Sequence, residues 1–241
     1  MKNILLISGH GGTDPGAVAF GKREADLTRE LVTLLQKEIL KYSCKCDVYD
    51  MSRSMYKDII TNGYSYDFSK YDYVLEVHFN AFKLDNGDGK NKGTEIYVTT
   101  SEKGITVEEK ILKAMVSLGF TNREVKRKNW AVISRAKKQG VSSALFETCF
   151  MDDADDMKIY NANKKAIANG VAKAIADGFK IPKKEENTVG FTDTQSHWAK
   201  ADIEKVASKG IMGGYSDNTF KPDKAVTRAE LATVIARIIK D

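Results

Sequence analysis

Short apolar runs alternate with longer amphipathic stretches over the first 180 residues of the chain. The runs predict β-strands, because a few consecutive apolar residues bounded by turn residues are typical of a buried strand. Stretches in which apolar residues recur every three or four positions predict helices with one buried face. This alternation favours an α/β fold, a mostly parallel, twisted sheet flanked by helices. The predicted strands are residues 4–7, 46–49, 71–78, 94–99, 130–133 and 143–150, and the predicted helices are 24–42, 57–61, 107–118 and 157–179.

The pattern changes after residue 180. Residues 181–188 have no apolar periodicity, contain a proline and carry adjacent like charges, which predicts a linker between domains 1–180 and 189–241. The second domain is small, with helices predicted over 201–209 and 228–240. Thr227 precedes the latter helix, and Glu230 three residues later completes a capping box. Trp198 and Phe220 are the large side chains expected to fill its core.

Composition is that of a globular protein, with 42% hydrophobic and 29% charged residues in 241 positions. A net charge of +5 could favour approach to an anionic polymer. It is too small to indicate nucleic-acid binding, and no arginine-rich recognition helix accompanies it. No stretch approaches the roughly 20 apolar residues that span a bilayer, so membrane insertion is not expected.

The chain start and the cysteines bear on the compartment. The first residues lack a small-residue cleavage site and run directly into a core strand, so we expect synthesis in the cytoplasm without an export signal. Cys44 and Cys46 are two positions apart, and same-strand pairs seldom form disulfides. Together with Cys149 they are expected to be free thiols, consistent with a reducing compartment.

Four side chains suited to metal binding or proton transfer fall at or beside predicted strand ends. His10 follows the first strand in a loop rich in glycine and proline, and Glu24 begins the helix after that loop. His78 ends another strand, and Glu147 lies inside a third. Open α/β sheets bind ligands at the carboxyl ends of their strands. The residues alone leave two interpretations open: a metal site, or structural histidines with Glu24 as a first-turn acid stabilised by the helix dipole.

Glu147 and Asn80 are further candidate site residues. A carboxylate within an apolar run costs free energy unless it is paired, which indicates that Glu147 has a task. Asn80 follows His78 by two positions and so shares its side of the strand. Its amide is a candidate substrate contact, or else caps a turn.

Two polar segments are expected at the surface. The Asp/Asn/Gly cluster at 83–92 lacks the bidentate glutamate at position 12 of a calcium loop and is predicted to be a surface loop. The basic segment 122–129 is predicted to be a solvated loop, able to touch anionic groups of a polymer or peptide.

The motif Gly-His-Gly-Gly-x-Asp-Pro-Gly-Ala at 9–17, followed by Glu24, His78-Phe79-Asn80-Ala81 and Glu147, resembles the zinc-dependent N-acetylmuramoyl-L-alanine amidases of the Amidase_3 type. The resemblance covers residues 2–180. It implies a zinc cofactor held by His10, Glu24 and His78, with Glu147 as the catalytic acid/base. The implied reaction cleaves the bond between N-acetylmuramic acid and L-alanine in peptidoglycan. The chain departs from the family after Glu147, where Thr148 and Cys149 replace the usual small residue and glycine.

Residues 189–241, and above all Thr227-Arg228-Ala229-Glu230, resemble a single surface-layer homology motif, a module that binds secondary polymers of Gram-positive cell walls. This implies contacts from Arg228 and Trp198 to an anionic wall polymer. His197 belongs to this motif and is therefore not counted as a zinc ligand. Relatives pack three such motifs together, so a single motif implies either self-association as a trimer or docking on the catalytic domain.

Alternative functions remain at this stage. A zinc peptidase could use the same ligand types, although His10 and Glu24 are 14 positions apart, unlike the i, i+4 histidine pair of common metalloproteases. A non-catalytic wall-binding protein would fit the second domain alone. A host autolysin would perform the same chemistry but would need an export signal. Its expected absence favours a phage or prophage endolysin released through a holin lesion.

Overall fold

The computed structural model describes residues 1–184 and 190–239, which belong to two separate units. The first unit runs from Met1 to Lys183 and the second begins at Lys184. The first unit extends past the predicted linker start, because Ile181 is buried and the Ser43 amide donates a hydrogen bond to the Pro182 carbonyl. The remaining predicted linker residues, 185–188, and the predicted second-domain start at 189 lie outside the described residues.

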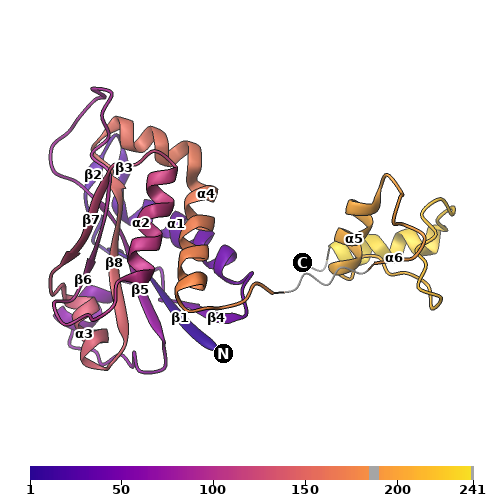
Figure 1. Ribbon diagram of the computed structural model, residues 1–241, viewed down its shortest axis with the longest axis horizontal. Helices are drawn as coiled ribbons and strands as arrows, with labels where there is room; N and C mark the ends of the chain where they lie inside the picture. Colours follow the sequence, from indigo (N-terminus) through magenta and orange to yellow (C-terminus); the bar gives the residue numbers. More distant parts are fainter. Residues whose placement is uncertain (185–189, 240–241) are drawn as a thin grey trace. The chain divides into compact units, whose positions relative to one another are not determined.

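A six-stranded sheet in the order β4-β1-β5-β8-β6-β7 organises the first unit (Figure 1). Every neighbouring pair is parallel except β6 and β8, which are antiparallel. The prediction of a mostly parallel sheet is therefore confirmed. The strands are β1 (Lys2–Ser8), β4 (Cys44–Val48), β5 (Tyr73–Asn80), β6 (Thr94–Val98), β7 (Asn122–Arg127) and β8 (Ser142–Phe150); a separate two-stranded ribbon joins β2 (Val18–Ala19) to β3 (Lys22–Arg23).

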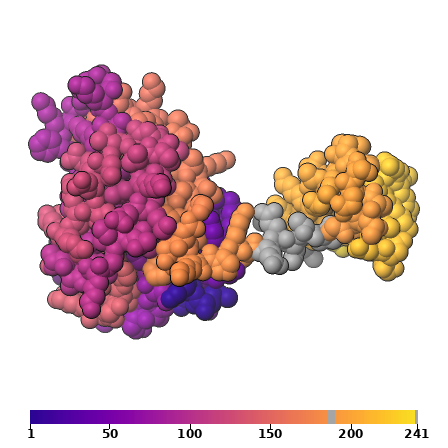
Figure 2. Space-filling model, viewed as in Figure 1, coloured from indigo at the N-terminus to yellow at the C-terminus, as the bar shows by residue number. Residues whose placement is uncertain are grey.

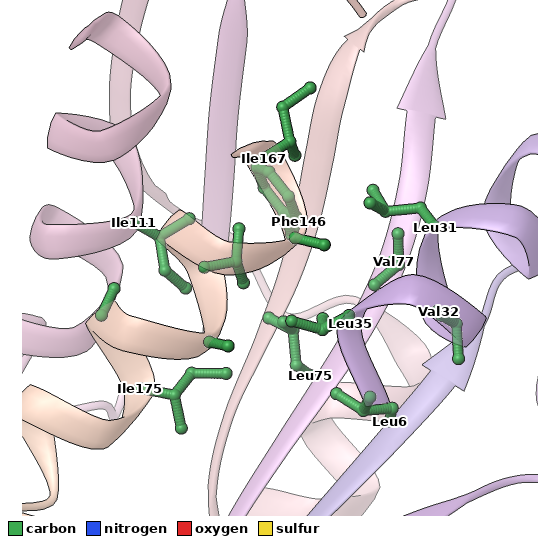
Figure 3. Close-up of a cluster of buried hydrophobic side chains, with 14 of the residues drawn as sticks. Leu6, Leu31, Val32, Leu35, Leu75, Val77, Ile111, Phe146, Ile167 and Ile175 are labelled. Carbon is green, nitrogen blue, oxygen red and sulfur yellow. The ribbon is translucent and has the colours of Figure 1, made fainter. Parts of the chain in front are cut away.

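Three long helices cover one face of this sheet: α1 (Glu24–Ile39), α2 (Thr106–Ser117) and α4 (Ala154–Gly178). Their apolar faces meet alternate side chains of the central strands in the larger core cluster (Figure 3). Full burial of a leucine or isoleucine contributes about 1.5–3 kcal/mol, so this layer supplies much of the stability. The cluster includes Leu31 and Leu35 of α1, Ile111 of α2, Ile167 and Ile175 of α4, and Leu6, Leu75, Val77 and Phe146 of the strands.

The opposite face carries a thinner cover made by α3 (Ala131–Lys138) and the π-helical turn η1 (Lys57–Thr61). Val132 and Ala136 of α3 and Ile59 of η1 pack there in the smaller core cluster with Val74 of β5. Strand side chains alternate between faces, so every second residue after Val74 points to this thinner layer. The polar residues of β5 and β8 described below lie on that side.

Two predictions around residue 130 are wrong. The predicted basic loop at 122–129 is mostly strand β7, paired in parallel with β6 at the edge of the sheet. This strand was not predicted because Val125 is its single apolar residue and its charged side chains resemble those of a loop. Charged side chains are common on edge strands. The predicted strand at 130–133 is instead the start of α3, in which Val132, Ile133 and Ala136 are buried at helical spacing.

The second unit contains α5 (Lys200–Ser208) and α6 (Arg228–Ile238). The predicted capping box is present: the Glu230 amide donates to the Thr227 hydroxyl, and the Thr227 amide donates to the Glu230 carboxylate. Phe220 packs against Phe191, with ring centroids 5.2 Å apart. Trp198 does not fill a core as predicted, because its side chain is 89% exposed. Phe191 and Ile203 provide the buried apolar side chains of this unit among the described residues.

Three surface and composition features complete the description. The segment 81–90 is almost entirely exposed and forms the predicted polar loop, which projects from the first unit (Figure 2). Cys44, Cys46 and Cys149 are all buried, and Cys46 and Cys149 are free thiols. Among the helices of the described residues, none has the length and apolar character needed to cross a membrane.

Candidate metal centre and active site

The glycine-rich loop after β1 places His10 at the carboxyl ends of the central strands. His10 has a φ of 61°, in the left-handed region that few non-glycine residues adopt. Gly9 gives room for the second histidine, since a Cβ at position 9 would lie 2.4 Å from the His78 ring. A Cβ on Gly16 would lie 2.7 Å from both the Glu24 carboxylate and the His10 ring. The glycines of the motif therefore make the close approach of three functional side chains possible.

His10, Glu24 and His78 form one cluster, and the ligand atoms they offer all lie within 4.8 Å of one another. Glu24 sits between the histidines: its Oε2 is 3.1 Å from His10 Nε2 and its Oε1 is 3.0 Å from His78 Nδ1. Backbone amides of Ala17 and Phe79 donate to the same two oxygens, both at 3.0 Å. The glutamate at the start of α1 is therefore fixed by four groups rather than left as a solvated first-turn acid.

The outer nitrogens of both histidines also face carboxylates. His10 Nδ1 lies 3.0 Å from Asp14 Oδ2, and His78 Nε2 lies 3.3 Å from Glu76 Oε1. A histidine that ligates a metal commonly donates its other N–H to a carboxylate, which fixes its tautomer. In this arrangement His10 presents Nε2 and His78 presents Nδ1 to the centre of the cluster.

The electrostatics of the cluster favour a positive charge at its centre. Burial alone would favour the neutral acid of Glu24, but hydrogen bonds with both imidazoles hold its pKa well below the usual range. Burial opposes protonation of His78, yet the carboxylates of Glu24 and Glu76 raise its pKa well above the ordinary value. A divalent cation would supply this charge while leaving both imidazoles neutral. The donor set of two histidines and one carboxylate fits zinc, with a fourth position left for water or substrate.

Glu147 lies beside this cluster, where β8 pairs residue by residue with β5 and Glu147 is opposite His78. Its Oε2 is buried and has no hydrogen-bond partner within residues 1–184 and 190–239. Burial raises the pKa of Glu147 to about 7. A carboxyl group that titrates near neutral pH is suited to take up and release a proton during a reaction.

A pocket of ≈ 330 Å³ joins these groups. Trp130 forms part of its wall; the ring meets Tyr97 edge to face at 5.9 Å, and the Lys128 ammonium lies 3.7 Å from its centroid. Trp130 was not among the site residues predicted from the sequence. The pocket is lined by His10, Asp14, Ser54, Tyr56, Glu76, His78, Trp130, Ala131, Val132, Leu145 and Glu147.

Asn80 is placed next to the site but does not line this pocket. Its amide donates to Glu95 Oε1 at 2.9 Å. Glu95 pairs with Glu147 across β6 and β8 and also receives hydrogen bonds from Tyr97, Arg123 and Lys126. Burial would raise the pKa of Glu95, but the two cations lower it. Asn80 thus belongs to a network that holds a charged carboxylate beside the less compensated Glu147.

Glu76 is the other residue that the sequence analysis missed. It is 4% exposed, and it stands in the middle of an apolar strand, Tyr73–His78. The signal that drew attention to Glu147, a carboxylate inside an apolar run, was therefore present at Glu76 as well.

The second unit presents its own candidate contacts. The Arg228 side chain is exposed and makes no hydrogen bond or ion pair with the residues that the structure describes. Trp198 is exposed beside His197, with ring centroids 5.6 Å apart. His197 Nε2 lies 3.3 Å from Asp223 and is not part of the metal-compatible cluster. A pocket of ≈ 410 Å³ in this unit includes Tyr215, Lys221, Lys224 and Arg237, so it combines positive charge with an aromatic ring.

Comparison with known proteins shows which protein families the two units match. The N-acetylmuramoyl-L-alanine amidase family matches residues 4–178, and the S-layer homology domain matches residues 190–232. An endolysin of Bacillus phage SPP1 is 26% identical, with 97% of this chain and 90% of that protein aligned. The amidase CwlM of Bacillus licheniformis is 27% identical over 89% of this chain and 83% of its own length.

Among solved structures, an N-acetylmuramoyl-L-alanine amidase from Clostridium difficile 630 superposes with a TM-score of 0.60. The superposition covers 74% of this chain and 97% of that one, at 20% sequence identity. At this identity the likeness shows a shared fold, a sheet flanked by helices as in the first unit.

Proposed function

Because the chain belongs to the N-acetylmuramoyl-L-alanine amidase family, we propose that His10, Glu24 and His78 hold a zinc ion at which peptidoglycan is cleaved. As an amidase of this family, the protein hydrolyses the bond between N-acetylmuramic acid and the L-alanine of the stem peptide. The observation that carries the zinc assignment is the close cluster of two imidazoles and one carboxylate in the same pocket as Glu147.

Each residue has a distinct part in this proposal. Zinc, when bound, would polarise the scissile carbonyl and make a water molecule more acidic. Glu147 accepts the proton of the attacking water and passes it to the leaving amine of L-alanine, since its carboxyl lines the pocket and its Oε2 has no hydrogen-bond partner in the described part of the chain. Asn80 supports the substrate side of the site through Glu95. Trp130 provides an apolar wall against which the substrate packs.

The products of digestion test the reaction. Mass spectrometry of digested peptidoglycan should reveal stem peptides with free L-alanine amino termini. New reducing sugar ends would instead identify a glycosidase, and cuts between amino acids of the stem would identify the zinc peptidase that the sequence leaves open.

We further propose that the protein acts as a phage or prophage endolysin that reaches the wall through a holin lesion. The near full-length similarity to an endolysin supports this role. A host autolysin with the same chemistry is the alternative, and CwlM illustrates a bacterial relative of similar extent. A holin gene beside the coding sequence is the expected finding, whereas a neighbourhood of host wall-synthesis genes would favour the autolysin.

The S-layer homology domain binds cell-wall polymers, and Arg228 is the proposed contact to an anionic group of a secondary polymer. Arg228→Ala should weaken binding of the full-length protein to walls of its host by about tenfold, as expected for one charge-assisted contact worth about 1.5 kcal/mol. Lys205→Ala, which removes the same charge from an exposed position on α5, is the control. Sedimentation of a fluorescent derivative with purified walls measures the effect. Equal loss in both variants, or full binding after the polymer is stripped, would reject the assignment to Arg228.

Trp198 is proposed as a neighbouring stacking contact, since its ring is exposed.

We also propose that this module self-associates, as a trimer. Helix α6 has no buried residue, and Leu231, Ile235 and Ile238 on it are 48%, 49% and 54% exposed. Burying this face between copies would remove apolar surface from water and place several polymer sites on one wall. Light scattering of the full chain at micromolar concentration should give three times the monomer mass, and Ile235→Glu should return it to the monomer. A monomeric wild-type chain would contradict the trimer.

A further inference from the structure

Glu76 is a buried carboxylate whose surroundings offer few hydrogen-bond donors. It is on β5, where its register partners are Ile7 of β1 and Leu145 of β8. In a parallel sheet, residues in register point to the same face, so apolar side chains flank Glu76 on both sides. Its Oε2 is buried and has no hydrogen-bond partner among the described residues. Burying a carboxylate oxygen without a hydrogen-bond partner costs free energy, so the presence of Glu76 at the centre of the sheet calls for a reason.

The partner that Glu76 does have is His78. Glu76 Oε1 lies 3.3 Å from His78 Nε2, and the other ring nitrogen, Nδ1, lies 3.0 Å from Glu24 Oε1 in the metal-compatible cluster. A proton on Nε2 satisfies Glu76 and leaves the lone pair of Nδ1 free for the cluster. A proton on Nδ1 would leave Nε2 without a hydrogen to share, and Glu76 would be left without a donor.

His10 has the mirror-image arrangement. Its Nδ1 faces Asp14 at 3.0 Å, and its Nε2 faces Glu24 at 3.1 Å. His10 thus offers Nε2 to the cluster and His78 offers Nδ1, and the other ring nitrogen of each histidine faces a carboxylate. Asp14 is partly exposed and makes further contacts, including one from the Gly16 amide. Glu76 is buried, and within residues 1–184 and 190–239 its side chain pairs with the histidine alone.

We propose that Glu76 is a positioning residue that selects the Nε2–H tautomer of His78 and so prepares Nδ1 to bind the metal. The proposal rests on the metal site of the proposed function and adds to it the group that orients one ligand. It also gives the buried carboxylate of Glu76 a task, because a bound divalent cation would compensate part of its negative charge.

Two substitutions separate this role from a structural one. Glu76→Met keeps the volume but removes the acceptor, whereas Glu76→Gln keeps an acceptor oxygen for Nε2–H. For the full-length Glu76→Met variant, zinc affinity measured by competition with a chromophoric chelator should fall about 10- to 100-fold, the usual effect of losing such a partner. Glu76→Gln should stay closer to the wild type. The thermal midpoint of metal-free Glu76→Met should equal or exceed that of the wild type, since a buried carboxylate oxygen with no hydrogen-bond partner among the described residues is gone.

A structural role predicts the opposite for the metal-free protein, namely a lower thermal midpoint with zinc affinity changed little. Nitrogen-15 NMR of the His78 ring, recorded at a pH high enough for the imidazole to be neutral, gives an independent readout: the proton is expected on Nε2 in the wild type and in exchange between the two nitrogens in Glu76→Met. Wild-type zinc affinity in Glu76→Met, or equal losses in both variants, would overturn the role of Glu76 alone. Failure of the wild-type protein to bind zinc would overturn the metal site itself.

Discussion

Alanine at both His10 and His78 should remove zinc from the protein and reduce amidase turnover on the order of 10³-fold or more. The reason is that these two imidazoles supply two of the three ligand atoms that converge within 4.8 Å, and Glu24 alone cannot retain the ion. Loss of the metal removes several kcal/mol of transition-state stabilisation, and each 1.36 kcal/mol is about a tenfold change in rate. Elemental analysis of purified protein measures the metal, and release of stem peptides measures turnover.

The third histidine is the matched control for this experiment. His197 lies in the second unit near Asp223, so His197→Ala should keep a full equivalent of zinc. Circular dichroism of all variants checks that the sheet remains folded. Stoichiometric zinc in the His10→Ala, His78→Ala protein would show that the ion is bound elsewhere or not by these ligands.

Glu147→Gln should retain zinc and lose on the order of 10²-fold or more in turnover, the usual contribution of a positioned acid/base. Glutamine matches glutamate in shape but cannot accept a proton from water at neutral pH. Because Glu147 is outside the three-residue cluster, the metal content should not change. Glu109→Gln, at an exposed position of α2, makes the same chemical change away from the pocket and should be fully active. Turnover of Glu147→Gln within a few-fold of the wild type would exclude the proton-transfer role, and loss of zinc would make Glu147 a ligand instead.

The site residues at the ends of strands could be located from the sequence. His10 and His78 are each recognisable at the end of an apolar run, and the pairing of β1 with β5 explains why they meet. That pairing is not visible in the spacing of the two residues, because it depends on which strands become neighbours. The resemblance to the amidases supplied the connection. The sequence also does not show which strand lies next to Asn80, so Asn80 could only be proposed as a substrate contact. In the structure its side-chain amide donates a hydrogen bond to Glu95 on β6.

Other elements were missed because their local pattern is ambiguous. Strand β7 has one apolar residue, Val125, and its charged neighbours resemble a loop. Helix α3 starts at Ala131, directly after Trp130, and the run Trp130 to Ile133 is one that a strand would also show. Trp198 was expected inside because large aromatic residues usually fill small cores, but it is 89% exposed. In each case the deciding factor is which neighbour covers the segment, and this is information that the local sequence does not contain.

The burial of the cysteines bears on how the enzyme tolerates different redox environments. Only the thiolate reacts readily, and burial raises the pKa of the Cys46 thiol to about 12 and that of Cys149 well above its ordinary value. Cys149 lies two residues after Glu147 on β8, but it points into the larger core cluster on the other face of the sheet. Oxidants that reach the pocket therefore meet no ionised sulfur on the path to the catalytic groups. A change in the redox state of the surroundings should therefore leave the Cys46 and Cys149 thiols of the folded enzyme unmodified.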